Sequence, residues 1–141
     1  MLDDALKDQL KALLVNLRHP IELVLSLDDS SGSAQLRELA QEVAAASSQV
    51  TIREAADDVE ARRPSFLITE PGQDSGVRFA GLPLGHEFSS LVLALLHVGG
   101  HPPKEDDQVL AAVRALNGPL HFETFFSVTC HNCPDVVQAL N

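Results

Sequence analysis

Tryptophan and tyrosine are absent from this 141-residue sequence, which has only two cysteines and one methionine. A hydrophobic core must therefore be built from Leu, Val, Ile, Ala and the six Phe residues. Hydrophobic residues make up 45% of the sequence, which is enough for one ordinary domain, or for a small domain and part of another. The composition is not that of a disordered chain.

Basic residues are scarce too, because 10 Lys and Arg stand against 20 Asp and Glu, giving a net charge of −10. Nucleic-acid binding depends on Lys and Arg side chains that neutralise phosphates, so this charge argues against a nucleic-acid partner and against an anionic membrane surface. The longest apolar stretch, Leu91 to Val98, is far shorter than the roughly 20 residues that span a bilayer. The acidic N-terminus, Met1 to Asp4, lacks the basic region of a secretory signal. We therefore expect a cytoplasmic protein with no membrane partner.

The spacing of apolar residues predicts helices and strands in sequence over residues 1–54. Leucines three and four positions apart indicate a helix from residue 2 to residue 17, which Pro20 ends. Residues 21–27 have the pattern of a buried strand. A second helix follows, with Ser33 as its candidate N-cap, and residues 50–53 form a second strand.

The next segment, residues 55–63, is charged and turn-like. After Pro64 we expect a third strand over residues 65–69, paired as a hairpin with a short fourth strand over residues 77–80. A third helix begins near residue 85 and ends at Gly99-Gly100. The two strands that flank the second helix should be parallel, and the hairpin should extend their sheet. This order predicts an α/β thioredoxin-like fold, a mixed sheet flanked by helices, complete within residues 1–100.

The same order of elements begins again after residue 100. A helix that starts at the acidic run 105–107, a turn and a strand over residues 120–128 precede the cysteines. Placing residues 21–27 on residues 122–128 puts Asp29 on Cys130 and Gly32 on Cys133. We therefore expect residues 1–100 to form a cysteine-free thioredoxin-like fold, and residues 101–141 the incomplete N-terminal part of a second, redox-active one. Coincidence is the alternative, because short helix–strand–helix units resemble one another.

Both cysteines lie in the run Cys130-His131-Asn132-Cys133-Pro134, directly after the last predicted strand. At a strand-to-helix junction this spacing is typical of a thioredoxin-like dithiol. It predicts both sulfurs on the first helical turn, where free backbone N–H groups and the helix dipole stabilise a thiolate. Cys130, expected to be exposed, is the candidate attacking thiol, and Cys133, expected to be more buried, the resolving thiol. A protonated His131 would make the disulfide more oxidising.

Two other interpretations of the cysteine pair stay open. Cys-X-X-Cys also supplies half of a zinc site, but a closed structural site needs four ligands, and none of the six histidines has a ligand-type spacing to the pair. The thiols could also be buried and inert.

Three further residue types are candidates for a role near the dithiol. Pro64 precedes a central strand, where thioredoxin-like folds keep a cis-proline, and we expect it to be cis. Glu87 opens a helix, a position that favours an acid through the helix dipole alone. His86 and His101 are interpreted as surface histidines of loops.

Five blocks of the sequence closely resemble the N-terminal domain of the F component of bacterial alkyl hydroperoxide reductase: residues 64–69, 78–81, 83–88, 99–102 and 127–141. The resemblance extends over essentially the whole chain. It implies a tandem pair of thioredoxin-like folds, the first without cysteines and the second with the redox pair. The chain then resembles a form truncated within the second fold, and residues 120–141 would pack on the first fold, pair with another chain or be partly disordered.

The resemblance also implies a function. In that family the domain is an electron shuttle, reduced by a C-terminal flavoprotein module that uses FAD and NADH. The shuttle reduces the disulfide of a peroxiredoxin partner, the C component of the same reductase, which destroys peroxides. The family implicates the residue matching Glu87 as an acid–base group for the dithiol. The flavoprotein module is missing from this sequence, so we expect no cofactor or metal in the chain and no full activity. The alternative is a non-catalytic docking module formed by residues 1–98.

Overall fold

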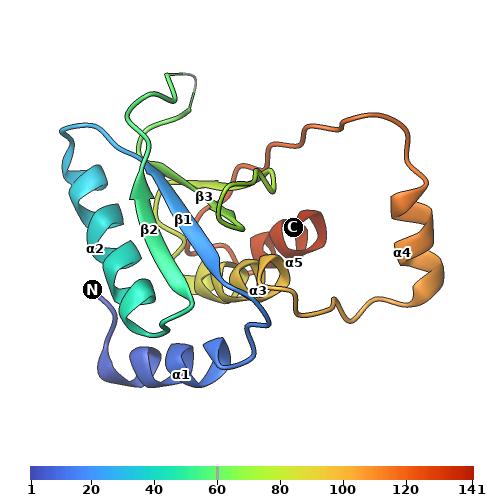
Figure 1. Cartoon of the computed structure of the whole chain (residues 1–141), viewed down its shortest axis with the longest axis horizontal. Coiled ribbons are helices and arrows are strands. Elements are labelled where there is room, and N and C mark those ends of the chain that lie inside the picture. The colour runs from blue at the N-terminus through green and yellow to red at the C-terminus, as the bar shows by residue number, and fades with distance from the viewer. Residues whose placement is uncertain (60) are drawn as a thin grey trace.

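The computed structural model describes residues 1–59 and 61–141 (Figure 1). Residue 60, which belongs to the predicted turn-like segment 55–63, lies outside the described residues. In chain order the elements are α1 (Asp4–Leu14), β1 (Ile21–Ser26), α2 (Ser31–Ala45), β2 (Val50–Glu54), β3 (Ser65–Thr69), β4 (Val77–Ala80), the 3₁₀ turn η1 (Gly85–Glu87), α3 (Phe88–Val98), α4 (Asp107–Arg114) and α5 (Cys133–Leu140).

The strands form one mixed sheet in the order β2-β1-β3-β4. β1 and β2 are parallel and joined through α2, as the sequence predicts. β3 pairs antiparallel with β1 on one side and with β4 on the other, so the predicted hairpin does extend the sheet. The boundaries differ from the predicted ones by a few residues, chiefly at the first helix, which is shorter at both ends.

Alternation along the strands determines which face of the sheet carries the core. Ile21, Leu23 and Leu25 point to one face, where they share a core with apolar side chains of α1, α2 and α3. Val24 points to the other face and belongs to a small separate cluster with Ala55 and Leu67. All three helices therefore contribute to the same core, which fixes the position of α3 and of η1 at its N-terminus.

The N-terminus of α2 differs from the prediction. Ser30 is the N-cap, and its hydroxyl accepts from the Ser33 N–H at 3.2 Å, so the expected cap at Ser33 is wrong. The Ser33 hydroxyl instead donates to Asp28 Oδ1 at 2.6 Å. The acidic run before α4 behaves as predicted, because Asp106 caps that helix and accepts from the Val109 N–H at 2.8 Å.

Residues 120–128 are not the predicted strand: they contain no strand in the described structure. A strand needs a neighbour to pair its N–H and C=O groups, and this segment is hydrogen-bonded to none of the four strands. Phe122 and Phe125 remain 63% and 78% exposed. Phe126, in contrast, packs partly against the core.

Helices α4 and α5 have different surroundings. In Figure 1, α4 stands apart from the sheet on two long connections, and none of its residues is buried. Helix α5 lies against α3, with Val137 5% exposed within the main core. The Gln138 amide donates to the hydroxyls of Ser89 and Ser90, both at 3.2 Å. Of the three arrangements expected for the C-terminal segment, packing against residues 1–98 describes α5.

Candidate redox site

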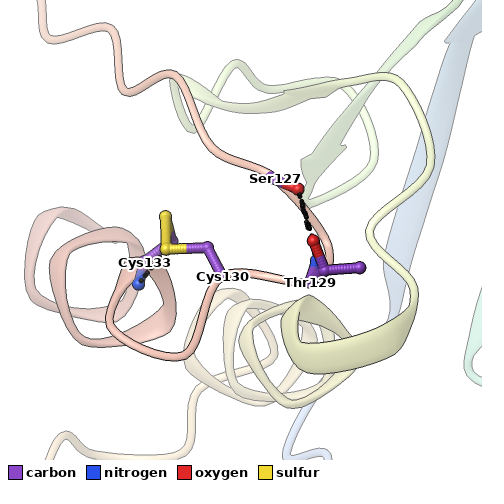
Figure 2. Close-up of a disulfide and its surroundings, with 4 residues drawn as sticks. All are labelled: Ser127, Thr129, Cys130 and Cys133. Carbon is purple, nitrogen blue, oxygen red and sulfur yellow. Dashed lines mark hydrogen bonds between the residues drawn. A yellow bond between two sulfur atoms is a disulfide. The ribbon is translucent and has the colours of Figure 1, made fainter.

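Cys130 and Cys133 are joined in a disulfide, with their Cα atoms 5.5 Å apart (Figure 2). The turn that carries them is held locally. The Cys130 N–H donates to the Ser127 carbonyl at 3.0 Å, and the hydroxyls of Ser127 and Thr129 share a hydrogen bond of 3.0 Å. The structure therefore shows the oxidised form of the pair.

The placement of the two sulfurs differs in part from the prediction. Helix α5 begins at Cys133, so Cys130 lies three residues before it and not in its first turn. The Asn132 side chain makes no capping hydrogen bond; instead the Cys133 N–H donates to Cys130 Sγ at 3.2 Å. Both cysteines are half-buried, so Cys130 is less exposed than predicted. Cys130 Sγ nevertheless occupies the helix N-terminus, where a thiolate is stabilised.

The dithiol turn rests on η1, at the start of α3. The His86 N–H donates to the Val128 carbonyl at 2.9 Å. Gly85 has φ +58°, and a Cβ at this position would be 2.7 Å from the Val128 carbonyl oxygen. The rings of His86 and His131 are in contact, with centroids 4.4 Å apart. His86 is thus an exposed residue, as predicted, but it is also a neighbour of the dithiol.

Glu87 follows in the same turn, and it is fully buried. Neither of its carboxylate oxygens has a hydrogen-bond partner among the described residues. Burial of an unpaired polar group costs free energy, so such a residue in a native fold calls for an explanation. The turn that holds Glu87 contacts α5, the helix that begins at Cys133.

The turn after β1 occupies the position that matches the dithiol in the proposed repeat. The hydroxyl groups of Ser30 and Ser33 donate to the Asp28 carboxylate. They lower its pKa to about 2, with the larger effect from Ser30. The Arg63–Pro64 bond is cis, as expected, and Pro64 faces this turn: a Cβ on Gly32 would lie 3.4 Å from Pro64 Cγ. In the proposed repeat, Asp29 and Gly32 of this turn align with Cys130 and Cys133, and the hydrogen-bond network of Asp28 lies beside them.

The zinc interpretation gains no support from the described part of the chain. No group of three or more His, Cys, Asp and Glu side chains that could hold a metal occurs in residues 1–59 and 61–141. Over the same residues, no helix is long and apolar enough to cross a bilayer.

Comparisons with known proteins show which proteins this chain resembles. No family model matches the chain. Over all of its 141 residues the chain is 56% identical to the F component of alkyl hydroperoxide reductase from Escherichia coli, and it spans 27% of that protein's length. The chain matches the N-terminal part of this reductase component, AhpF.

Solved structures agree with this match. The N-terminal domain of AhpF from Enterococcus faecalis superposes with a TM-score of 0.84 at 28% identity, over 99% of this chain and 72% of that one. A protein disulfide oxidoreductase from Aeropyrum pernix superposes with a TM-score of 0.81 at 20% identity, over 98% of this chain and 66% of that one. The second likeness concerns the fold alone, and it confirms the thioredoxin-like architecture.

Sequence reasoning missed the contacts of three residues that surround the dithiol: Gly85, His86 and Val128. These contacts join positions more than 40 residues apart, which no local spacing reveals. A glycine directly before a helix start was the one available hint, because glycine is favoured where the backbone needs a positive φ.

Proposed function

We propose that the chain is the electron-shuttle module of an NADH-dependent peroxiredoxin reductase of the AhpF type. On this proposal residues 1–100 are a cysteine-free thioredoxin-like fold, and residues 101–141 begin a second fold that supplies the redox pair. The observation that carries the proposal is the hydrogen bond from the Cys133 N–H to Cys130 Sγ at the start of α5. This contact would stabilise a thiolate at Cys130 in the reduced form.

The chemistry is a two-step thiol–disulfide exchange. The Cys130 thiolate attacks one sulfur of the peroxiredoxin disulfide, forms a mixed disulfide and releases the other peroxiredoxin sulfur as a thiolate. Cys133, after losing its proton, attacks Cys130 Sγ, which restores the Cys130–Cys133 disulfide and releases the second peroxiredoxin thiolate. Two electrons pass to the partner, and its two thiolates take up the two protons that the dithiol loses.

Glu87 is proposed as the acid–base group that handles these protons. A buried carboxyl group without a hydrogen-bond partner can accept a proton from a nearby thiol and return it. A purely structural role accounts poorly for the burial of this residue, because an apolar side chain in the same position would avoid the desolvation cost.

Renewed reduction of the disulfide requires a reductant from outside residues 1–141. We propose a flavoprotein module with FAD and NADH, as in the family that the chain resembles, and assign no residue of this chain to either cofactor. A dithiol that donates electrons needs a reducing compartment, so we place its action in the cytoplasm.

Single-turnover transfer tests the proposal. The chain is reduced, freed of reductant and mixed with an oxidised peroxiredoxin, the C component of an alkyl hydroperoxide reductase, and the thiols of each protein are counted over time. We expect up to one peroxiredoxin disulfide to be reduced per Cys130–Cys133 pair oxidised. A peroxiredoxin that stays oxidised, while the chain still exchanges with a small dithiol, would refute the proposal.

Docking without catalysis is the second candidate function. It is favoured by the turn after β1, where Asp28 and two serines form a closed hydrogen-bond network that contains no thiol. The reduced wild-type chain, mixed with oxidised peroxiredoxin, separates the two functions. Docking without catalysis predicts binding of the peroxiredoxin but no electron transfer, whereas the electron shuttle predicts both.

A further inference from the structure

His86, in the turn η1, contacts the chain on both sides of Cys130. On one side the His86 N–H donates to the carbonyl of Val128, two residues before the cysteine. On the other side the His86 ring contacts the ring of His131, the residue after it, at a centroid distance of 4.4 Å. The attacking cysteine is therefore bracketed by a backbone contact and a ring contact from the same short turn.

Gly85 brings the two segments this close. Its φ of +58° is disfavoured for residues with a Cβ, and the added Cβ would lie 2.7 Å from the Val128 carbonyl oxygen. Real Cβ atoms essentially never approach so closely, and the obstacle is a backbone atom, so the dithiol turn itself would have to move. Gly72 also has a positive φ, of +81°, but its Cβ would meet nothing within 4 Å.

We propose that Gly85 and His86 are positioning residues for the Cys130–Cys133 pair. They act through Val128 and His131, so a part of the chain that has no cysteine sets the reactivity of the dithiol. This inference shares one assumption with the proposed function, namely that the Cys130–Cys133 pair is redox-active.

A chain of short contacts links Gly85 to the sulfur. The Cys130 N–H is bonded to the Ser127 carbonyl, one residue before Val128, and the Cys133 N–H is bonded to Cys130 Sγ. Displacement of Val128 therefore shifts the turn and weakens the hydrogen bond that would stabilise the Cys130 thiolate. The reduced form loses this stabilisation, whereas the disulfide, which carries no charge, loses less.

The first test uses Gly85→Ala, with Gly72→Ala as the matched control for the cost of a Cβ at positive φ. Two quantities are measured in the 141-residue chain: the equilibrium constant for reduction of the disulfide by glutathione, and the rate of Cys130 alkylation by iodoacetamide in a Cys133→Ser background. In the alkylation the thiolate displaces iodide and forms a thioether. We expect Gly85→Ala to lower both about threefold to tenfold. Gly72→Ala should leave both unchanged. Equal values in the two variants would overturn the proposal.

The second test uses His86→Ala and His86→Phe, and it decides the matter if Gly85→Ala does not fold. His86→Ala keeps the backbone donor but removes the ring, and it should lower the alkylation rate. His86→Phe retains a ring against His131 and should restore the rate. Equal rates in the wild type and in both variants would contradict a positioning role. Both probes are small molecules, so failure of transfer to the peroxiredoxin would count against the proposed function and leave this inference standing.

Discussion

The N–H of Cys133 donates to Cys130 Sγ at 3.2 Å, so a sulfur atom accepts the first of the backbone N–H groups that are free at the N-terminus of α5. Because the donor of this hydrogen bond belongs to the first residue of α5, the reactivity of the cysteine pair depends on the position of that helix. Any change that detaches α5 from α3 should therefore alter the dithiol as well as the fold.

Loss of the core contact of α5 tests this coupling. Val137 is 5% exposed and packs in the main core, whereas its neighbour Val136 is 51% exposed. We expect Val137→Ala to lower the free energy of unfolding by about 1–3 kcal/mol, because it removes two buried methyl groups and leaves a cavity. Val136→Ala should change it by less than about 0.5 kcal/mol.

Amide hydrogen exchange is the measurement for this prediction. In Val137→Ala the amides of α5 should exchange faster than those of β1 and β3, because the helix opens locally before the sheet does. Uniform acceleration over the whole chain would mean that α5 is not a separate unit.

Glu87→Gln should have different effects on the free energy of unfolding and on the rate of disulfide exchange. The substitution keeps the shape of the side chain and removes a carboxyl group that is buried without a partner. We expect the free energy of unfolding in urea to stay the same or rise, while the rate of disulfide exchange with the peroxiredoxin falls at least about tenfold. An unchanged exchange rate would remove Glu87 from the mechanism, and a large loss of stability would assign it a structural role.

The Asp28 network makes acid stability predictable. Hydrogen bonds from Ser30 and Ser33 lower the pKa of Asp28 to about 2 in the folded chain, from an ordinary value of 3.8. A lowered folded pKa gives a contribution to stability that is full above the unfolded value and lost as the pH falls towards the folded value. Asp28→Asn should therefore remove a stabilisation that the wild type loses between about pH 4 and pH 2. Circular dichroism at pH 7 and pH 2 tests this: the wild type and the variant should differ in thermal stability at pH 7 and converge at pH 2.

Much of the fold could be predicted because its elements are encoded locally. The apolar run of β1, the leucine spacing of α1 and the turn residues before β4 each indicate structure within a few positions. The strand expected over residues 120–128 had the same apolar character, yet it is not formed. An apolar pattern shows that a segment is able to form a strand, but a strand also needs hydrogen bonds to a neighbour, and residues 120–128 pair with none of the four strands.

The redox site could be predicted in its chemistry but not in its surroundings. Cys-X-X-Cys identifies the dithiol because two intervening residues are enough to bring the two sulfur atoms together. The contacts of Gly85 and His86 depend on how α5 docks on α3, a long-range event that leaves no pattern in either segment. The cap at Ser30 was missed for a smaller reason: several serines compete there, and the choice between them depends on Asp28.

Trapping of the mixed disulfide tests the central claim most directly. The Cys133→Ser chain is mixed with the oxidised peroxiredoxin component of an alkyl hydroperoxide reductase, and the product is analysed by non-reducing electrophoresis and peptide mass spectrometry. The account predicts a stable one-to-one adduct joined through Cys130, because the thiol that would resolve it is missing, and no such adduct for Cys130→Ser. Failure to form an adduct through Cys130, in a chain shown to be folded and reduced, would contradict the account.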